Sequence, residues 1–179
     1  MALLGHLPFD VRALVDYPGA VAPEENETTY RGNALLKARA ASRLTGTWAL
    51  ADDSGLEVDA LGGAPGLHSA RYGGPGLDDA GRCAWLLEAL RDVPDDRRTA
   101  RFRCVIAIVD PAGREWVVEG VAEGTIAHEP RGTSGFGYDP LFSYPPLGKT
   151  FAELSDAEKS DVSHRGRAAR LARELLTGV

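Results

Sequence analysis

Apolar residues recur at helical spacing in two stretches of the chain. Residues 33–44 are rich in alanine and leucine, which favours a helix, and Gly46 stands where such a helix would end. Residues 80–90 place leucines on one face, and Asp78 or Asp79 can cap the first turn. The pattern therefore predicts two amphipathic helices.

Helix signals return towards the C-terminal end. Ser155 and Glu158 form a capping-box pattern, which predicts a short helix. Ser163 can cap a final helix. Helical spacing assigns the apolar face of that helix to Ala168, Leu171, Ala172 and Leu175.

Strand patterns fill the positions between the helices. Residues 47–51 have the length of a short buried strand, and residues 56–61 alternate between apolar and acidic side chains, which predicts a half-exposed strand. Residues 100–109 and 115–126 predict a hairpin, because the turn-forming residues Asp110–Gly113 lie between them. Strands and helices alternate around this hairpin, so the expected class is α/β, with a mixed β-sheet and flanking helices.

Length and composition are those of an ordinary globular protein. The chain has 179 residues, of which 44% are hydrophobic and 26% charged, so we expect a single domain over residues 1–179. The formal net charge of −6 argues against an extended nucleic-acid-binding face, which is usually basic. The sequence has neither an apolar stretch long enough to span a membrane nor a convincing signal peptide. We therefore expect a cytoplasmic protein that binds neither nucleic acid nor membrane.

The cysteines carry no sign of metal binding. Cys83 lies in the predicted helix 80–90 and Cys104 in the predicted strand 100–109, and they form no C-x-x-C motif. We expect both thiols to be buried as small hydrophobic groups, which suits a reducing compartment.

A pair of carboxylates follows the first predicted strand. Asp52 and Asp53 precede Ser54 and Gly55, and we expect these residues to form a loop at the C-terminal end of that strand. Adjacent side chains of an extended backbone point to opposite sides, so one carboxylate can face a ligand while the other holds the loop. Mg²⁺ prefers one or two carboxylates plus phosphate oxygens, and a carboxylate beside it can activate water. For Asp53 we favour such a function, whereas Asp52 alternatively caps a turn.

Other charges flank the first predicted helix. Glu24 and Glu25 precede it and offer a second carboxylate for a metal, although charges in a loop are usually only solvated. Lys37 lies within the helix among alanines and leucines. A lone lysine at such a position usually extends along the protein surface.

The run Gly135-Phe136-Gly137-Tyr138-Asp139-Pro140 combines glycine, aromatic and acidic residues. Glycine lets backbone N–H groups approach a ligand closely, and Phe136 and Tyr138 offer rings for stacking. Lys149 and Lys159 follow with positive charge for an anionic ligand. Together with the Asp52-Asp53 pair, this mixture predicts a nucleotide site with a metal, whereas each run taken alone is more typical of a turn.

His164 and Arg165 occupy the first turn of the last predicted helix. Backbone N–H groups at a helix start and the guanidinium fork of arginine all donate hydrogen bonds. Such donors match the 6-oxo group of a purine and mismatch the 6-amino group of adenine, because donor would meet donor. The alternative is that Arg165 pairs with an acid and His164 caps the helix.

These runs together resemble the inosine triphosphate pyrophosphatase family, the house-cleaning dITP/XTP pyrophosphatases. They follow the order of the family and cover nearly the whole chain. The resemblance is carried by Asn33–Ala38, Ala51–Leu56, Gly62–Gly66, Ser69–Tyr72, Gly135–Pro140 and Ser163–Gly166.

The resemblance implies hydrolysis of non-canonical purine nucleoside triphosphates (dITP, ITP and XTP) to monophosphate and pyrophosphate, with Mg²⁺. It also implies a two-lobed α/β fold and a homodimer. In this pattern Asp53 is the general base and a metal ligand, and Glu25 is the second metal carboxylate. Lys37 and Ser54 face the phosphates.

The same resemblance assigns the remaining residues to the base and the sugar. The base and sugar are held by Phe136, Gly137, Tyr138 and Asp139. The base pocket is completed by Lys159, His164 and Arg165.

The chain departs from the family pattern near its N-terminus. The family usually begins with a strand and a Thr-Gly-Asn…Lys loop that grips the triphosphate, so the expected sheet lacks its first strand. The family's Glu-Asn before the first helix is Gly32-Asn33 here. One alternative is therefore a shortened nucleotide-binding protein with weak or no catalysis. Another is a structural dimer without a ligand, against which the intact Phe136–Asp139 and His164–Arg165 runs argue.

Overall fold

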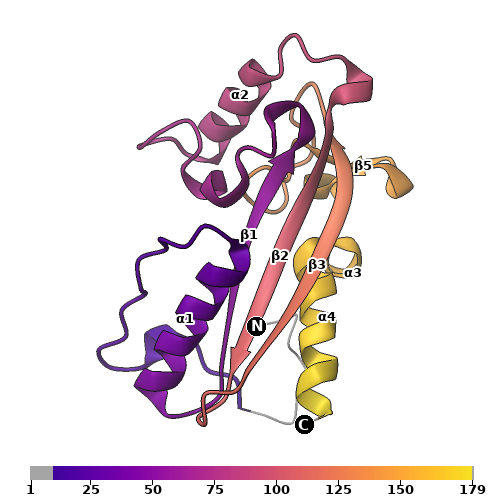
Figure 1. Cartoon of the computed structure of the whole chain (residues 1–179). Helices are drawn as coiled ribbons and strands as arrows, with labels where there is room; N and C mark the ends of the chain where they lie inside the picture. The colour runs from indigo at the N-terminus through magenta and orange to yellow at the C-terminus, as the bar shows by residue number, and fades with distance from the viewer. Residues whose placement is uncertain (1–9, 179) are drawn as a thin grey trace. The chain divides into compact units, whose positions relative to one another are not determined.

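The computed structural model describes residues 10–178, and the expectation of a missing first strand concerns positions outside this range. Among the described residues the sheet has five strands in the order β1-β2-β3-β4-β5. Their bounds are Ala49–Val58, Thr99–Val109, Glu115–Ile126, Phe142–Tyr144 and Lys149–Thr150. Figure 1 shows β1, β2 and β3 running in alternating directions, and β4 is antiparallel to both β3 and β5. The predicted α/β class, with a sheet flanked by helices, is confirmed, and the described strands pair antiparallel where a mixed sheet was expected.

The described residues divide into two compact units. Unit 1 comprises the residues up to Asp53, Cys104–Gly120 and the residues from Arg165 onward. Unit 2 comprises Ser54–Arg103 and Val121–His164. The two units agree with the two-lobed fold that the family resemblance implies, and the single domain over residues 1–179 stays a prediction.

Helix α1 (Tyr30–Thr45) belongs to unit 1 and begins at Tyr30 rather than at residue 33. The side chain of Thr29 accepts a hydrogen bond from the Gly32 N–H at 3.0 Å, which satisfies one of the open donors of the first turn. The helix ends before Gly46, as predicted from the sequence.

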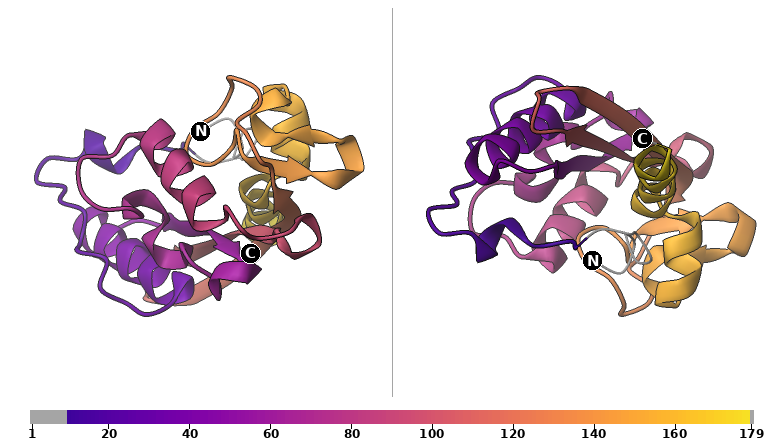
Figure 2. Two further views of the ribbon diagram at one scale, coloured as in Figure 1. Left: turned by 90° about the horizontal axis from the view of Figure 1, so that it is seen from above. Right: turned by 90° about the horizontal axis from the view of Figure 1, so that it is seen from below.

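Helix α4 (His164–Thr177) packs through small side chains onto the sheet of unit 1. The buried contact joins Ala168, Ala169 and Ala172 to Cys104, Ile106 and Ile108. Leu171, which we expected on this face, is 43% exposed, because the buried contact is made by Ala168, Ala169 and Ala172 instead. Figure 2 shows α1 and α4 on opposite sides of the strands of unit 1.

The connection between β2 and β3 confirms the predicted hairpin. Both carboxylate oxygens of Asp110 accept hydrogen bonds from Arg114, at 2.8 Å from its backbone N–H and 2.6 Å from its Nε. The side chain of Asp110 therefore closes the turn that its sequence predicted.

Helix α2 (Asp79–Ala89) belongs to unit 2 and also matches its prediction. The Asp78 carboxylate caps it by accepting a hydrogen bond from the Gly81 N–H at 2.8 Å. Leu86 and Leu90 are fully buried in the core of this unit. Aromatic rings fill the same core, with centroids 4.8 Å apart for Phe102 and Phe142 and 4.7 Å apart for Phe142 and Phe151.

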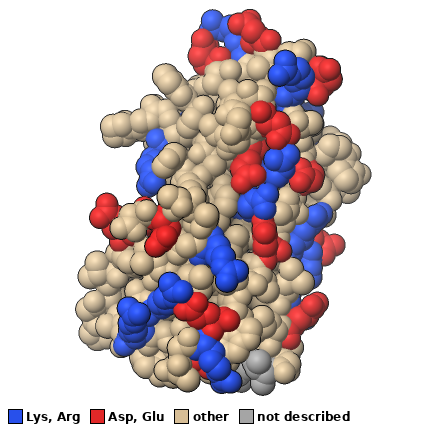
Figure 3. Space-filling model, in the orientation of Figure 1, with Lys and Arg blue, Asp and Glu red and all other residues tan. Residues whose placement is uncertain are grey.

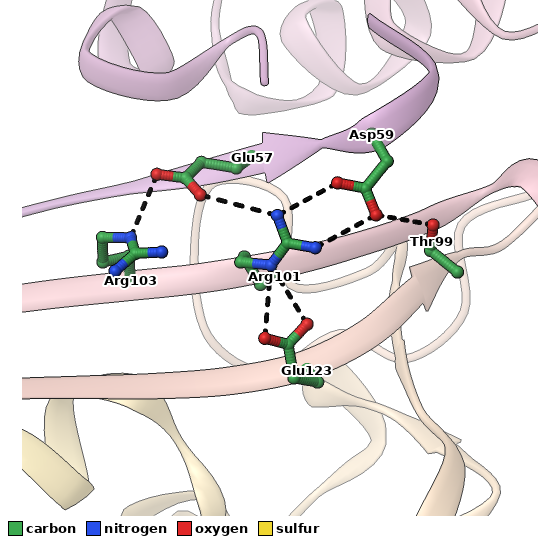
Figure 4. A network of polar contacts seen from close by, with 6 residues as sticks. All are labelled: Glu57, Asp59, Thr99, Arg101, Arg103 and Glu123. Atoms are coloured by element: carbon green, nitrogen blue, oxygen red, sulfur yellow. Dashed lines mark hydrogen bonds and ion pairs between the residues drawn. The ribbon is translucent and has the colours of Figure 1, made fainter. Parts of the chain in front are cut away.

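Charged side chains cover the face of the unit 2 sheet that points away from this core (Figure 4). The guanidinium of Arg101 contacts Asp59 at 3.0 Å and Glu123 at 3.1 Å, and Arg103 donates to Glu57 at 3.1 Å. Acidic and basic side chains are likewise interspersed over the face drawn in Figure 3. Two guanidinium groups in Figure 4 thus face three carboxylates, so each positive charge is paired within the chain.

No helix of residues 10–178 has the length and apolar character needed to cross a membrane. Short 3₁₀ turns connect the main elements of the described chain. The turns are Leu14–Asp16, Asp59–Leu61, Gly66–Arg71, Asp95–Arg97, Pro145–Leu147 and Phe151–Glu153.

Helix α3 (Asp156–Val162) begins with the predicted capping box. The Ser155 hydroxyl accepts from the Glu158 N–H at 3.3 Å, and the Glu158 carboxylate accepts from the Ser155 N–H at 2.8 Å. The box fixes the start of the helix that carries Lys159.

Replacing Ser155 by alanine is expected to lower the free energy of unfolding by about 1 kcal/mol, because one N–H of the first turn loses its acceptor. Urea denaturation measures the change. Ser155→Thr keeps the hydroxyl and should stay near the wild type. Equal stability of the alanine and threonine variants would show that the cap contributes nothing.

Candidate functional site

Asp52 and Asp53 lie within β1, which runs without interruption from Ala49 to Val58. The expectation of a loop over residues 52–55 is therefore wrong. Their side chains are typical of turns, but β1 is hydrogen-bonded to β2, and this pairing keeps the backbone extended. Because successive side chains of a strand point to opposite faces, Asp52 and Asp53 meet different partners.

Asp53 faces α1 and the segment before it, all within unit 1. Its Oδ2 accepts a hydrogen bond from Asn33 Nδ2 at 3.0 Å, and Lys37 Nζ lies 3.7 Å from its Oδ1. The same Nζ donates to Glu25 Oε1 at 2.5 Å, and both Glu25 and its neighbour Glu24 are exposed. The structure therefore brings together Glu25, Lys37 and Asp53, three of the predicted site residues.

The carboxylates of Glu25 and Asp53 lie within reach of one positive charge, the ammonium group of Lys37. Across residues 10–178, three or more His, Cys, Asp or Glu side chains nowhere gather in a way that could hold a metal. Two carboxylates completed by substrate oxygens are the donor set that Mg²⁺ commonly uses. The residues present thus fit a metal ion whose remaining ligands are phosphate oxygens of a substrate.

Asn33 is a site residue that the sequence reasoning missed. Its side chain is 3% exposed and donates to Asp53, while its Oδ1 accepts from the Glu27 N–H at 3.1 Å. It thereby ties the loop before α1 to the carboxylate in β1. A polar amide beside the buried Ala34 and Leu35 was the available signal, because buried polar groups need partners.

Asp52 pairs with the first turn of α4. Arg165 Nε donates to Asp52 Oδ2 at 3.2 Å, which is the acid pairing that the sequence left open as an alternative. Cys104 lies 3.8 Å from the same oxygen, and burial together with the Asp52 charge raises the pKa of its thiol to about 12. Cys104 is therefore a protonated, buried thiol, and Cys83 is buried as well, as predicted.

In unit 2 the structure brings Phe136, Asp139 and Lys159 together. Phe136 is 61% exposed, and Lys159 Nζ lies 5.1 Å from the centre of its ring. The Asp139 carboxylate accepts from the Phe136 N–H at 2.8 Å and forms an ion pair with Lys159. An exposed ring beside a cation can stack on a flat, anionic ligand.

Tyr138 does not offer the stacking face expected from the sequence. It is 3% exposed and belongs to the core of unit 2. Its hydroxyl donates to the Ser69 carbonyl at 2.9 Å, and burial raises its pKa well above the usual range. The backbone bends between these two residues, so Phe136 ends outside and Tyr138 inside, which residue type alone does not reveal.

The remaining predicted residues are placed as follows. His164 is 6% exposed and stacks on Phe102, with centroids 4.5 Å apart, within unit 2. Arg165, the next residue, belongs to unit 1. Ser54 is half-buried and follows Asp53 in β1, and Gly137 lies in the turn beside Phe136 with a positive φ of 60°.

Comparison with known proteins gives a consistent result. The family model described as the Ham1 family matches residues 1–175. A dITP/XTP pyrophosphatase of Exiguobacterium sibiricum is 50% identical over 98% of this chain and 89% of its own length, and one of Shigella flexneri is 50% identical over the same shares. A HAM1 protein structure from Coxiella burnetii superposes with a TM-score of 0.92 at 43% identity, covering 99% of this chain and 91% of that one. A nucleoside-triphosphatase / dITP/XTP pyrophosphatase from Mycobacterium abscessus gives 0.77 at 47% identity, covering 91% and 83%.

Proposed function

We propose that this chain, which belongs to the Ham1 family, hydrolyses dITP, ITP and XTP to the monophosphate and pyrophosphate. The observation that carries the proposal is the similarity, along nearly the whole chain, to relatives named dITP/XTP pyrophosphatase. The group around Asp53 contains the residue types that such a reaction needs.

In the proposed reaction Asp53 is the general base. It takes a proton from a water molecule that attacks the α-phosphorus, and the bond from this phosphorus to the bridging oxygen breaks, so pyrophosphate leaves with the electron pair. The hydrogen bond from Asn33 to Oδ2 fixes the orientation of the carboxylate. A base held in this way typically contributes about 10²–10⁴-fold to the rate.

We further propose Mg²⁺ as the cofactor, held by Asp53 and Glu25. When bound, this ion would neutralise negative charge on the phosphate oxygens. Lys37, which contacts both carboxylates, adds a positive charge beside the phosphates, and the Ser54 hydroxyl adds a donor.

The purine is assigned to the residues that the family resemblance gives for the base. Phe136 supplies the stacking ring and Lys159 the cation beside it, while Asp139 holds both. His164 and Arg165 supply donors for the 6-oxo group, which adenine lacks.

We also propose a homodimer, on the basis of the family resemblance. The buried, free cysteines support a reducing compartment, and we propose the cytoplasm. Light scattering after size-exclusion chromatography measures the mass. A value of one 19.1 kDa chain would contradict the dimer.

Purified protein supplied with Mg²⁺ and ITP is expected to release IMP and pyrophosphate. In a phosphate assay, orthophosphate should therefore appear only after inorganic pyrophosphatase is added, and chelation of the metal should abolish the signal. Release of orthophosphate without pyrophosphate would contradict the proposed bond cleavage. ITP binding without turnover would instead favour a nucleotide-binding protein that lacks catalysis.

A further inference from the structure

Helix α2 holds the turn that carries Phe136, through a single residue, Gly137. Asp79 Oδ2 accepts a hydrogen bond from the Gly137 N–H at 2.7 Å, and Cys83 Sγ donates to the Gly137 carbonyl at 3.4 Å. Asp79 and Cys83 are four positions apart, so their side chains share one face of the helix. Both polar groups of Gly137 are thus bound by α2, within unit 2.

The Asp79 carboxylate is itself oriented for this contact. Arg82 Nη2 donates to Asp79 Oδ1 at 2.6 Å, and Arg82 Nη1 donates to the Leu77 carbonyl at 2.5 Å. The hydrogen bond from Arg82, followed by that from the Gly137 N–H, lowers the pKa of Asp79 below its usual value. The carboxylate is therefore ionised near neutral pH and accepts only.

Capping of α2 does not explain the position of Asp79. The cap is provided by Asp78, whose side chain accepts from the Gly81 N–H. Asp79, in the first turn, is free of that task and reaches across to residue 137. Its contact joins segments that lie 58 positions apart in the sequence.

The neighbouring residue of the turn, Phe136, is held by Asp139. Asp139 accepts from the Phe136 N–H at 2.8 Å, and the Asp139 N–H donates to the Phe136 carbonyl at 3.2 Å. Successive N–H groups, at Phe136 and Gly137, therefore each end on a carboxylate. This fixes the backbone of the turn although the residue that it displays, Phe136, is 61% exposed.

We propose that Asp79 is a positioning residue for purine binding, which holds the Phe136–Gly137 turn in the conformation that presents the Phe136 ring. The inference rests on the proposed function. Asp79 acts through the Gly137 N–H and does not touch the nucleotide. Without this contact the turn has to be ordered when the nucleotide binds, and that ordering weakens binding.

The test compares KM and kcat for ITP in Asp79→Ala, Asp79→Asn and Asp78→Ala. Asp79→Ala should raise KM about tenfold and leave kcat within about twofold, because the chemical step is untouched while binding is weakened. Asp79→Asn keeps one oxygen acceptor for the Gly137 N–H, but its NH₂ group then faces the donor Arg82 Nη2, so it should restore only part of the loss. Asp78→Ala is the matched control: it removes the cap of the same helix and should lower Tm without changing KM.

The outcomes separate this inference from the proposed function. If the wild type does not hydrolyse ITP, the proposed function fails. If the wild type is active but Asp79→Ala has the wild-type KM, or Asp78→Ala raises KM equally, only the positioning role is overturned. Should Asp79→Ala not fold, Asp79→Ser replaces it in the test. The shorter serine side chain suits a helix start and cannot reach Gly137. A wild-type KM in Asp79→Ser would equally overturn the positioning role.

Discussion

Replacing Asp53 by asparagine is expected to lower kcat for ITP by about 10²–10⁴-fold, the usual contribution of a general base. Asparagine has nearly the same shape as aspartate but cannot take up the proton of the attacking water. The side chain is 12% exposed and lies between Asn33 and Lys37, so the variant should keep its fold. Pyrophosphate release under saturating ITP and Mg²⁺ measures kcat, and circular dichroism checks the fold.

Asp52→Asn is the matched control, because it removes the neighbouring carboxylate on the opposite face of β1. Asp52 pairs with Arg165 rather than with Lys37, and the loss in kcat should be clearly smaller. A folded Asp53→Asn protein with nearly normal turnover would show that another group activates the water.

Arg165→Ala is expected to narrow the preference for ITP over ATP by roughly ten- to a hundredfold, because a hydrogen bond from a charged group is worth about 1.5–3 kcal/mol. The 6-oxo group of hypoxanthine accepts from such a donor, and the 6-amino group of adenine does not. Arg165→Lys should restore the preference only in part, since lysine lacks the planar guanidinium fork. The measured quantity is the ratio of kcat/KM for ITP to that for ATP.

The ion pair with Asp52 supplies the control for this experiment. If Arg165 acts only by holding α4 to β1, Asp52→Ala should reproduce every effect of Arg165→Ala. If it recognises the base, Asp52→Ala should leave more of the ITP preference intact. An unchanged ratio in Arg165→Ala would refute the role in specificity.

Helices were predictable from the sequence because their signals are local. The caps Asp78 and Ser155 lie next to the first turns that they satisfy, and α2 and α3 begin there, whereas α1, capped by Thr29, begins three residues before the predicted start. The course of β1 was not predictable in the same way. Residues 52–55 favour turns locally, but pairing with β2, far along the chain, decides their conformation.

Within the site, residue types could be predicted but not their partners. The group of Glu25, Lys37 and Asp53 joins residues from one part of the sequence, each of which the family resemblance had named as a candidate. The burial of Tyr138 and the pairing of Arg165 with Asp52 depend on segments 69 and 113 positions away. Contacts at such separations are set by the packing of the sheet and leave no local pattern.

The alternation of Asp52 and Asp53 along β1 limits how the gene can change in length. Inserting or deleting one codon within the strand ahead of this pair would turn the side chains on one side of the change to the other face. The two carboxylates would then exchange faces, which would separate one from Lys37 and the other from Arg165. Homologous chains should therefore vary in length within loops, such as the segment between β1 and α2, and within β1 only by pairs of residues.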